Sequence, residues 1–187
     1  MIPEAPLTDS GSGLAPAGDG WFVVSVRDAQ WLTSENGEKK PSGSECSFES
    51  GAAEFSQVGI RIHVLEPGEP NGLYHAESQQ EAFLVLSGEC TLLVEGEERL
   101  LRKWDFFHCP AGTEHIFVGA GDGPCVIFMA GSRSGDWQVH YPVSALAARY
   151  GVSVEEEMSD PREAYVRAGF EPSRRERPSY WNSLPWA

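Results

Sequence analysis

Short apolar segments separated by glycine, proline and acidic residues dominate the middle of this chain, from residue 58 to residue 131. The segments are VGIRIHVLE, FLVLS, CTLLVE, ERLLRKW, FFHCP, HIFVG and PCVIFMAG. Short strands at this spacing are typical of an antiparallel sandwich or barrel. The segment Trp21–Val26 (WFVVSV) predicts a further strand, whose edge could join the sheet of a neighbouring chain.

The flanks of this region differ from it. Residues 1–20 are rich in Gly, Pro, Ser, Asp and Ala, which predicts a flexible leader. After residue 136, YPVSALAARYGVSVEEE and SDPREAYVRAGF predict two short helices, the second with Pro161 in its first turn. We therefore expect a barrel over 21–136. A helical extension and an Arg- and Trp-rich tail, packed on the barrel or on a partner subunit, would occupy 137–187.

Charge and composition exclude several classes of partner. The chain has 187 residues, and its 14 Lys and Arg against 28 Asp and Glu give a formal net charge of −14. Nucleic acids and anionic membranes need a basic surface, so we expect neither as a partner. The N-terminus has no basic segment followed by an apolar one, and no apolar run is long enough to cross a bilayer.

The cysteines indicate a reducing compartment. None of the four forms a CxxC pair, and no secretory signal precedes them, which favours free thiols and a cytoplasmic location over disulfides or a zinc ribbon. These residues are Cys46, Cys90, Cys109 and Cys125.

Four potential metal ligands stand where predicted strands begin. His75 and Glu77 lie two residues apart, so on an extended strand their side chains share a face. Glu81 precedes the apolar run Ala82–Leu86, and His115 follows a Pro-Ala-Gly turn. Charged groups beside an apolar segment are costly to dehydrate without a partner, and either a metal ion or water could supply it.

Other side chains carry weaker signals. His63 lies on the opposite face of its segment from Ile62 and Val64 and could point into the barrel or into solvent; a non-functional role is the more common one for such a histidine. We expect Cys109 to be a core residue. The remaining expected core residues are Phe83, Leu92, Phe106, Phe117, Ile127 and Phe128.

The chain resembles the cupin superfamily over about residues 58–131. The first cupin motif contains His-x-His, a Glu after three or four residues and a Gly six residues beyond it. Here His75, Glu77, Glu81 and Gly88 take those places. Three residues lie between Glu77 and Glu81, and six lie between Glu81 and Gly88. The second motif, Gly-Asp, Pro-x-Gly, two residues and His, corresponds to Trp104-Asp105, Pro110-Ala111-Gly112 and His115. The 15 residues between Gly88 and Trp104 match the short spacing of small microbial cupins.

The sequence also departs from these motifs. Glu77 replaces the second histidine, Trp104 replaces the leading glycine of the second motif, and Gly119 stands where that motif often ends in Asn. Glu77 could therefore be a metal ligand, a carboxylate that orients a ligand histidine, or a general base when it is not bound to the metal.

The resemblance implies an all-β fold, a double-stranded β-helix of jelly-roll type, here with a short helical C-terminal extension. It implies one divalent metal per chain (Fe, Mn, Zn or Ni) held by His75, Glu77, Glu81 and His115. It also implies a homodimer and either of two functions. One is a metal-dependent oxygenase, isomerase or lyase acting on a small organic molecule. The other is a non-catalytic module that binds a small molecule such as a sugar, with or without metal.

Overall fold

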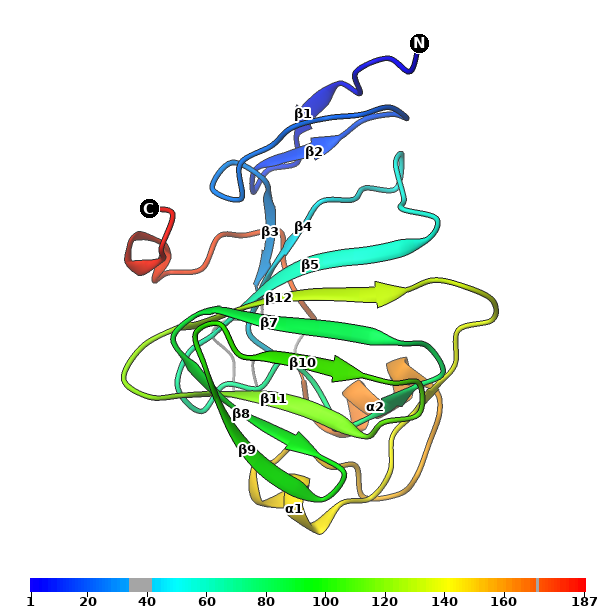
Figure 1. The fold of residues 1–187 in the computed structure, drawn as a ribbon, viewed down its shortest axis with the longest axis vertical. Coiled ribbons are helices and arrows are strands. Elements are labelled where there is room, and N and C mark those ends of the chain that lie inside the picture. The colour runs from blue at the N-terminus through cyan, green and yellow to red at the C-terminus, as the bar shows by residue number, and fades with distance from the viewer. Residues whose placement is uncertain (34–41, 171) are drawn as a thin grey trace.

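The computed structural model describes residues 1–33, 42–170 and 172–187. Most of its strands belong to two antiparallel sheets, as the resemblance predicts (Figure 1). In spatial order, the larger sheet contains β10 (Phe106–Cys109), β7 (Glu81–Ser87), β12 (Cys125–Ser132), β5 (Val58–Leu65), β4 (Ser44–Ser47) and β3 (Gln30–Thr33). The smaller sheet contains β11 (His115–Ala120), β8 (Glu89–Val94) and β9 (Glu97–Arg102).

The main core lies between these two sheets. It joins residues of the larger sheet, such as Phe83 and Ile127, to residues of the smaller one, such as Leu92 and Phe117. Cys109 is buried in this cluster, as expected. Apolar side chains on the facing surfaces of two sheets account for the alternation seen in the strand segments. The fold is all-β, a double-stranded β-helix of the predicted type.

Short elements flank this core. Two small antiparallel pairs are β1 (Leu7–Asp9) with β2 (Leu14–Pro16), and β13 (Val139–His140) with β6 (Ala76–Glu77). The predicted helical extension is present as α1 (Ala145–Arg149) and α2 (Pro161–Arg167), and η1 (Trp181–Ser183) is a single 3₁₀ turn. Side chains of Ser144 and Asp160 cap the two α-helices at their N-termini. None of the described helices is long and apolar enough to cross a membrane.

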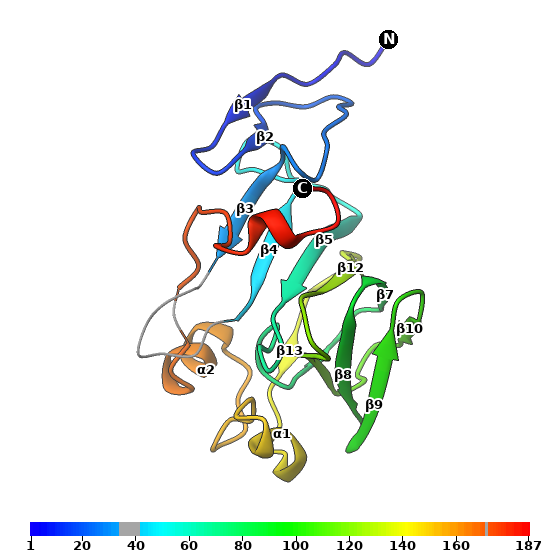
Figure 2. The same ribbon diagram turned by 90° about the vertical axis from the view of Figure 1, so that its left-hand side faces the viewer.

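The C-terminal tail packs on its own barrel. Trp31 of β3 lies with its ring centroid 5.2 Å from that of Trp181 and 5.4 Å from that of Trp186. These rings and the buried Leu184 cover apolar residues of the larger sheet on the side away from the main core. Figure 2 shows the tail lying across β3, β4 and β5. The sequence left open whether the tail packs on the barrel or on a partner subunit, and in the structure it packs on the barrel.

Two predictions about the strands are wrong. Trp21–Val26 is not a strand; only Trp21 makes an isolated bridge, to Glu4. Val24 and Val26 pack against the apolar cluster around Trp31 and Leu184, while Val23 is exposed. The alternation therefore reflects packing on one side of the segment, without a hydrogen-bonded neighbouring strand.

Phe106, which we expected in the core, is 63% exposed. Cys109 and Phe107 point inward from β10, so the alternating residues Phe106 and His108 point outward.

Gly119 differs from the motif's Asn for a steric reason. A Cβ atom built on Gly119 would lie 2.1 Å from the carbonyl oxygen of Glu66, so no side chain fits there. We expect Gly119→Ala to lower the free energy of unfolding by about 2 kcal/mol or more, because the backbone must shift. Gly123→Ala, where nothing lies within 4 Å, is the matched control. Urea unfolding of both variants is the measurement, and equal stabilities would contradict the expectation.

Trp104 has a backbone conformation that favours glycine. Its φ is 76°, in the left-handed region, and its side chain is 66% exposed. Left-handed backbone costs a side-chain-bearing residue roughly 1–2 kcal/mol, and a β-branched residue suffers most. We therefore expect the Trp104→Gly variant to have a higher midpoint temperature of thermal unfolding than the Trp104→Val variant. For Phe106, an exposed aromatic residue in strand β10, the order should reverse, since strands favour valine over glycine. The same order at both positions would contradict the assignment of strain to Trp104.

Candidate metal site

Three of the four sequence-predicted ligands meet where the two sheets come together. His75 and His115 form an antiparallel bridge: the His75 N–H donates to the His115 carbonyl at 3.2 Å, and the reverse bond is 2.8 Å long. This pairing sets the two imidazole centroids 4.9 Å apart. Glu81 opens β7 of the larger sheet and places a carboxylate oxygen 3.4 Å from Nε2 of His115. Ligand atoms of these three residues lie within 4.8 Å of one another.

The hydrogen bonds of the two histidines orient their free nitrogens toward this group. Nδ1 of His75 lies 2.7 Å from the Leu73 carbonyl oxygen, and Nδ1 of His115 lies 3.1 Å from the Thr113 carbonyl oxygen. A carbonyl oxygen only accepts, so each Nδ1 carries the proton, and each Nε2 presents a lone pair. The buried Oε2 of Glu81 has no hydrogen-bond partner in the described structure. Two lone pairs and an unpartnered carboxylate oxygen are a donor set that suits a divalent cation.

Burial keeps the cluster from accumulating charge without a metal. It lowers the pKa of His115 to about 3, with a further contribution from the neighbouring His75, and burial also lowers the pKa of His75. Burial, and then the charge of Glu77, raise the pKa of Glu81 to about 8. At neutral pH the imidazoles are therefore neutral and the Glu81 carboxyl holds a proton, which a cation would have to displace.

Glu77 does not belong to this group of three. Its Oε1 is 3.8 Å from Nε2 of His75, and its Oε2 accepts a 2.8 Å hydrogen bond from Nε1 of Trp137. Trp137 lies in the segment between β12 and β13, 60 residues away along the chain. The indole holds the carboxylate to the side of the cluster while leaving it in the same pocket.

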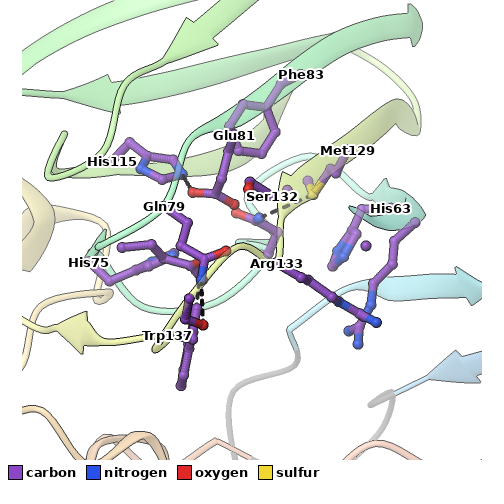
Figure 3. Close-up of a pocket in the computed structure, with 16 residues that line it drawn as sticks. His63, His75, Gln79, Glu81, Phe83, His115, Met129, Ser132, Arg133 and Trp137 are labelled. Atoms are coloured by element: carbon purple, nitrogen blue, oxygen red, sulfur yellow. Dashed lines mark hydrogen bonds and ion pairs between the residues drawn. The ribbon is translucent and has the colours of Figure 1, made fainter. Parts of the chain in front are cut away.

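The cluster forms one wall of a cavity of about 590 Å³ (Figure 3). The other walls contain residues that the sequence did not single out, and the cavity also reaches His63. For Arg61 the sequence contains one signal, the alternation of GIRIHVLE, which places it on the same face as His63. For Gln79, Arg133 and Trp137 the sequence contains no signal. The lining residues are Gly59, Arg61, His63, Asn71, His75, Glu77, Gln79, Glu81, Phe83, His115, Met129, Gly131, Ser132, Arg133, Gly135 and Trp137.

Residues 61–131 match the model of the cupin domain family. Among solved structures, a cupin-superfamily sugar phosphate isomerase from Silicibacter pomeroyi is 22% identical, with 65% of this chain and 78% of that chain covered and a TM-score of 0.49. The polyketide cyclase RemF from Streptomyces resistomycificus is 13% identical, with 61% and 80% covered and a TM-score of 0.51. At these identities RemF shares the fold, and neither structure assigns a substrate to this chain. No curated protein matches the chain.

The raised pKa of Glu81 predicts an unusual dependence of stability on pH. Glu81 binds its proton more tightly in the folded protein than in the unfolded chain. The free energy of unfolding therefore falls as the pH rises from the pKa of Glu81 in the unfolded chain to its pKa in the folded protein. The lowered pKa values of His75 and His115 act below pH 6.5, in the opposite direction. Between pH 6.5 and 8, metal-free protein should therefore become less stable, by at most about 1.4 kcal/mol per pH unit.

Urea unfolding of metal-free protein across this range checks the prediction. Glu81→Gln should remove the slope, because the amide does not titrate, and Glu98→Gln on the surface should keep it. A slope that Glu81→Gln leaves unchanged would assign it to another group.

Proposed function

Since residues 61–131 form a cupin domain and the chain belongs to the cupin superfamily, we propose that it binds one divalent metal ion and uses it on a small organic molecule. His75, Glu81 and His115 would hold the ion. The observation that carries this proposal is the convergence of two imidazole lone pairs and the unpartnered Oε2 of Glu81 on one point of the cavity wall.

Three protein ligands support an enzyme over a storage site. Structural metal sites usually fill every coordination position with protein atoms, whereas catalytic sites leave at least one open. The two-histidine, one-carboxylate set leaves positions that face a cavity of about 590 Å³, a volume suited to a small substrate. A bound divalent ion would supply Lewis-acid chemistry there, and Fe, Mn, Zn and Ni all accept this donor set.

Glu77 is the residue that we assign to proton transfer beside the cluster. Its Oε1 has no role in holding Trp137 and lies 3.8 Å from His75, so it can meet a substrate bound at the cluster. The indole hydrogen bond fixes the carboxylate's orientation, which is the requirement for a general base.

We further propose a homodimer in the cytoplasm. Cupin barrels usually pair, and light scattering coupled to gel filtration would measure the mass of the assembly. The cysteines Cys46, Cys90, Cys109 and Cys125 are free and buried in the structure, which is compatible with a reducing compartment.

Elemental analysis of protein purified without a metal-affinity tag tests the metal site. We expect about one equivalent of divalent metal per chain. His115→Ala and Glu81→Gln should lose most of it, because each removes a ligand atom of the cluster. His108→Ala, an exposed histidine of β10, is the matched control and should keep it.

Glu77→Gln separates the roles of Glu77. If Glu77 acts on the substrate, this variant keeps its metal; loss of metal would make Glu77 a ligand instead. Wild-type protein that stays metal-free after incubation with each divalent ion would overturn the enzyme proposal and favour the non-catalytic binding module.

A further inference from the structure

A histidine and a carboxylate, His63 and Glu45, are paired at the wall of the cavity that β5 forms. His63 lies on β5, and its Nε2 is 3.2 Å from Oε2 of Glu45 on the adjacent strand β4. Nε2 therefore carries a proton that it donates to the carboxylate. Nδ1, the other ring nitrogen, is buried and has no hydrogen-bond partner in the described part of the chain.

An unpartnered buried nitrogen is expensive for a purely structural ion pair. Leaving such a group without a hydrogen bond costs roughly 1–3 kcal/mol, and folded proteins satisfy nearly all of them. Of the four unpartnered buried side-chain atoms found among the described residues, three belong to residues that line this one cavity. They are His63 Nδ1, Gln79 Oε1 and Glu81 Oε2. Unmet hydrogen-bonding capacity concentrated in one cavity indicates that a polar ligand completes it.

Glu45 is itself held in place. Nη1 of Arg61 lies 2.9 and 3.1 Å from the two carboxylate oxygens of Glu45. Burial opposes the charge on Glu45, but the hydrogen bonds from His63 and Arg61 and the positive charge of Arg61 outweigh it and lower the pKa of this carboxyl to about 2. Glu45 is therefore a fixed anion behind His63, which sets the tautomer of the ring and can stabilise its protonated form.

The position of His63 relative to the metal cluster suits a substrate that spans the cavity. Strand β12 separates β5 from β7, and the register places Glu81 level with Gly59, four residues from His63 along β5. The backbones of His63 and Glu81 are therefore about 10 Å apart across the sheet and about 13 Å apart along it. Figure 3 shows His63 on the far side of the cavity from His75 and His115, next to Met129.

We propose that His63, oriented by Glu45, accepts a proton from a hydroxyl group of the substrate whose other end lies at His75, Glu81 and His115. The substrate O–H bond breaks, its electron pair stays on oxygen, and the proton forms an N–H bond at Nδ1 of His63. The imidazolium keeps its Nε2–H toward the Glu45 carboxylate, and return of the proton restores the neutral ring. The substrate class is thus a small molecule that combines a metal-binding group with a hydroxyl donor. This inference rests on the proposed function.

Modification with diethyl pyrocarbonate tests whether Nδ1 is a reactive lone pair open to the cavity. The reagent acylates unprotonated imidazole nitrogens, and mass spectrometry measures the rate at each of the five histidines. In zinc-loaded wild-type protein we expect His63 to react measurably, but about tenfold or more slowly than the exposed His108 and His140, because its Nδ1 is buried. Zinc should protect His75 and His115. Their lower rates in zinc-loaded than in metal-free protein report on the metal site, so a failure there is distinguishable from a failure at His63.

Glu45→Gln provides the decisive comparison. Oε2 of Glu45 faces both Arg61 and Nε2 of His63, so the amide oxygen of the variant keeps both contacts and the tautomer of the ring. The negative charge behind the ring is lost, and the positive charge that forms on the imidazole when Nδ1 attacks the reagent is no longer stabilised. Modification of His63 should then slow by about tenfold. Glu49→Gln is the matched control, because Glu49 pairs with Arg133 in the same way without touching His63. The low rate at the buried His115 verifies that each variant is folded.

Long-range ¹H–¹⁵N spectra of the wild-type histidines, with His63→Gln used for assignment, provide a second measurement that needs no destabilising variant. We expect a protonated Nε2 and an unprotonated Nδ1 at His63. A proton on Nδ1, an unreactive His63 beside reactive His108 and His140, or an equal rate in Glu45→Gln would each overturn the proposal.

Discussion

The pairing of His75 with His115 is the contact on which the geometry of the site depends. Two backbone hydrogen bonds join these residues, each located where its strand begins. The bridge fixes two imidazoles side by side without any help from a metal, and the carbonyl groups of Leu73 and Thr113 fix both tautomers. Only Glu81 comes from the opposite sheet. The packing of the two sheets against each other therefore determines how closely the carboxylate approaches the imidazoles.

The cavity combines two kinds of electrostatic environment. Around the cluster, Glu81 and Glu77 lie close together, and burial favours the neutral form of Glu81. On the opposite wall, Arg61 and Arg133 are each matched by a carboxylate, Glu45 and Glu49 respectively. Because those charges are already balanced, a divalent ion held by Glu81 with Glu77 beside it would determine the charge at the other end of the cavity. A substrate group with negative charge or lone pairs would be drawn to that end of the cavity.

Much of the fold could be predicted from the sequence because alternation and turn residues are local properties. The positions of His75, Glu81 and His115 followed from motif spacing, since both motifs place their ligands where strands begin. The geometry at Glu77 could not be predicted, because its partner Trp137 is 60 residues away in a segment without a pattern. The Trp21–Val26 strand failed for a related reason: β propensity does not supply a neighbouring strand.

His63 illustrates what alternation can and cannot establish. The pattern of GIRIHVLE places His63 on the face opposite Ile62 and Val64, and in the structure that face lines the cavity while Ile62 and Val64 pack against the Trp31 cluster. The pattern is silent about Glu45, because cross-strand pairing between β4 and β5 is set by tertiary structure. A histidine acquires its chemistry from the group behind it and from the space in front of it. Both lie outside the segment that contains His63, and only the folded chain brings them together.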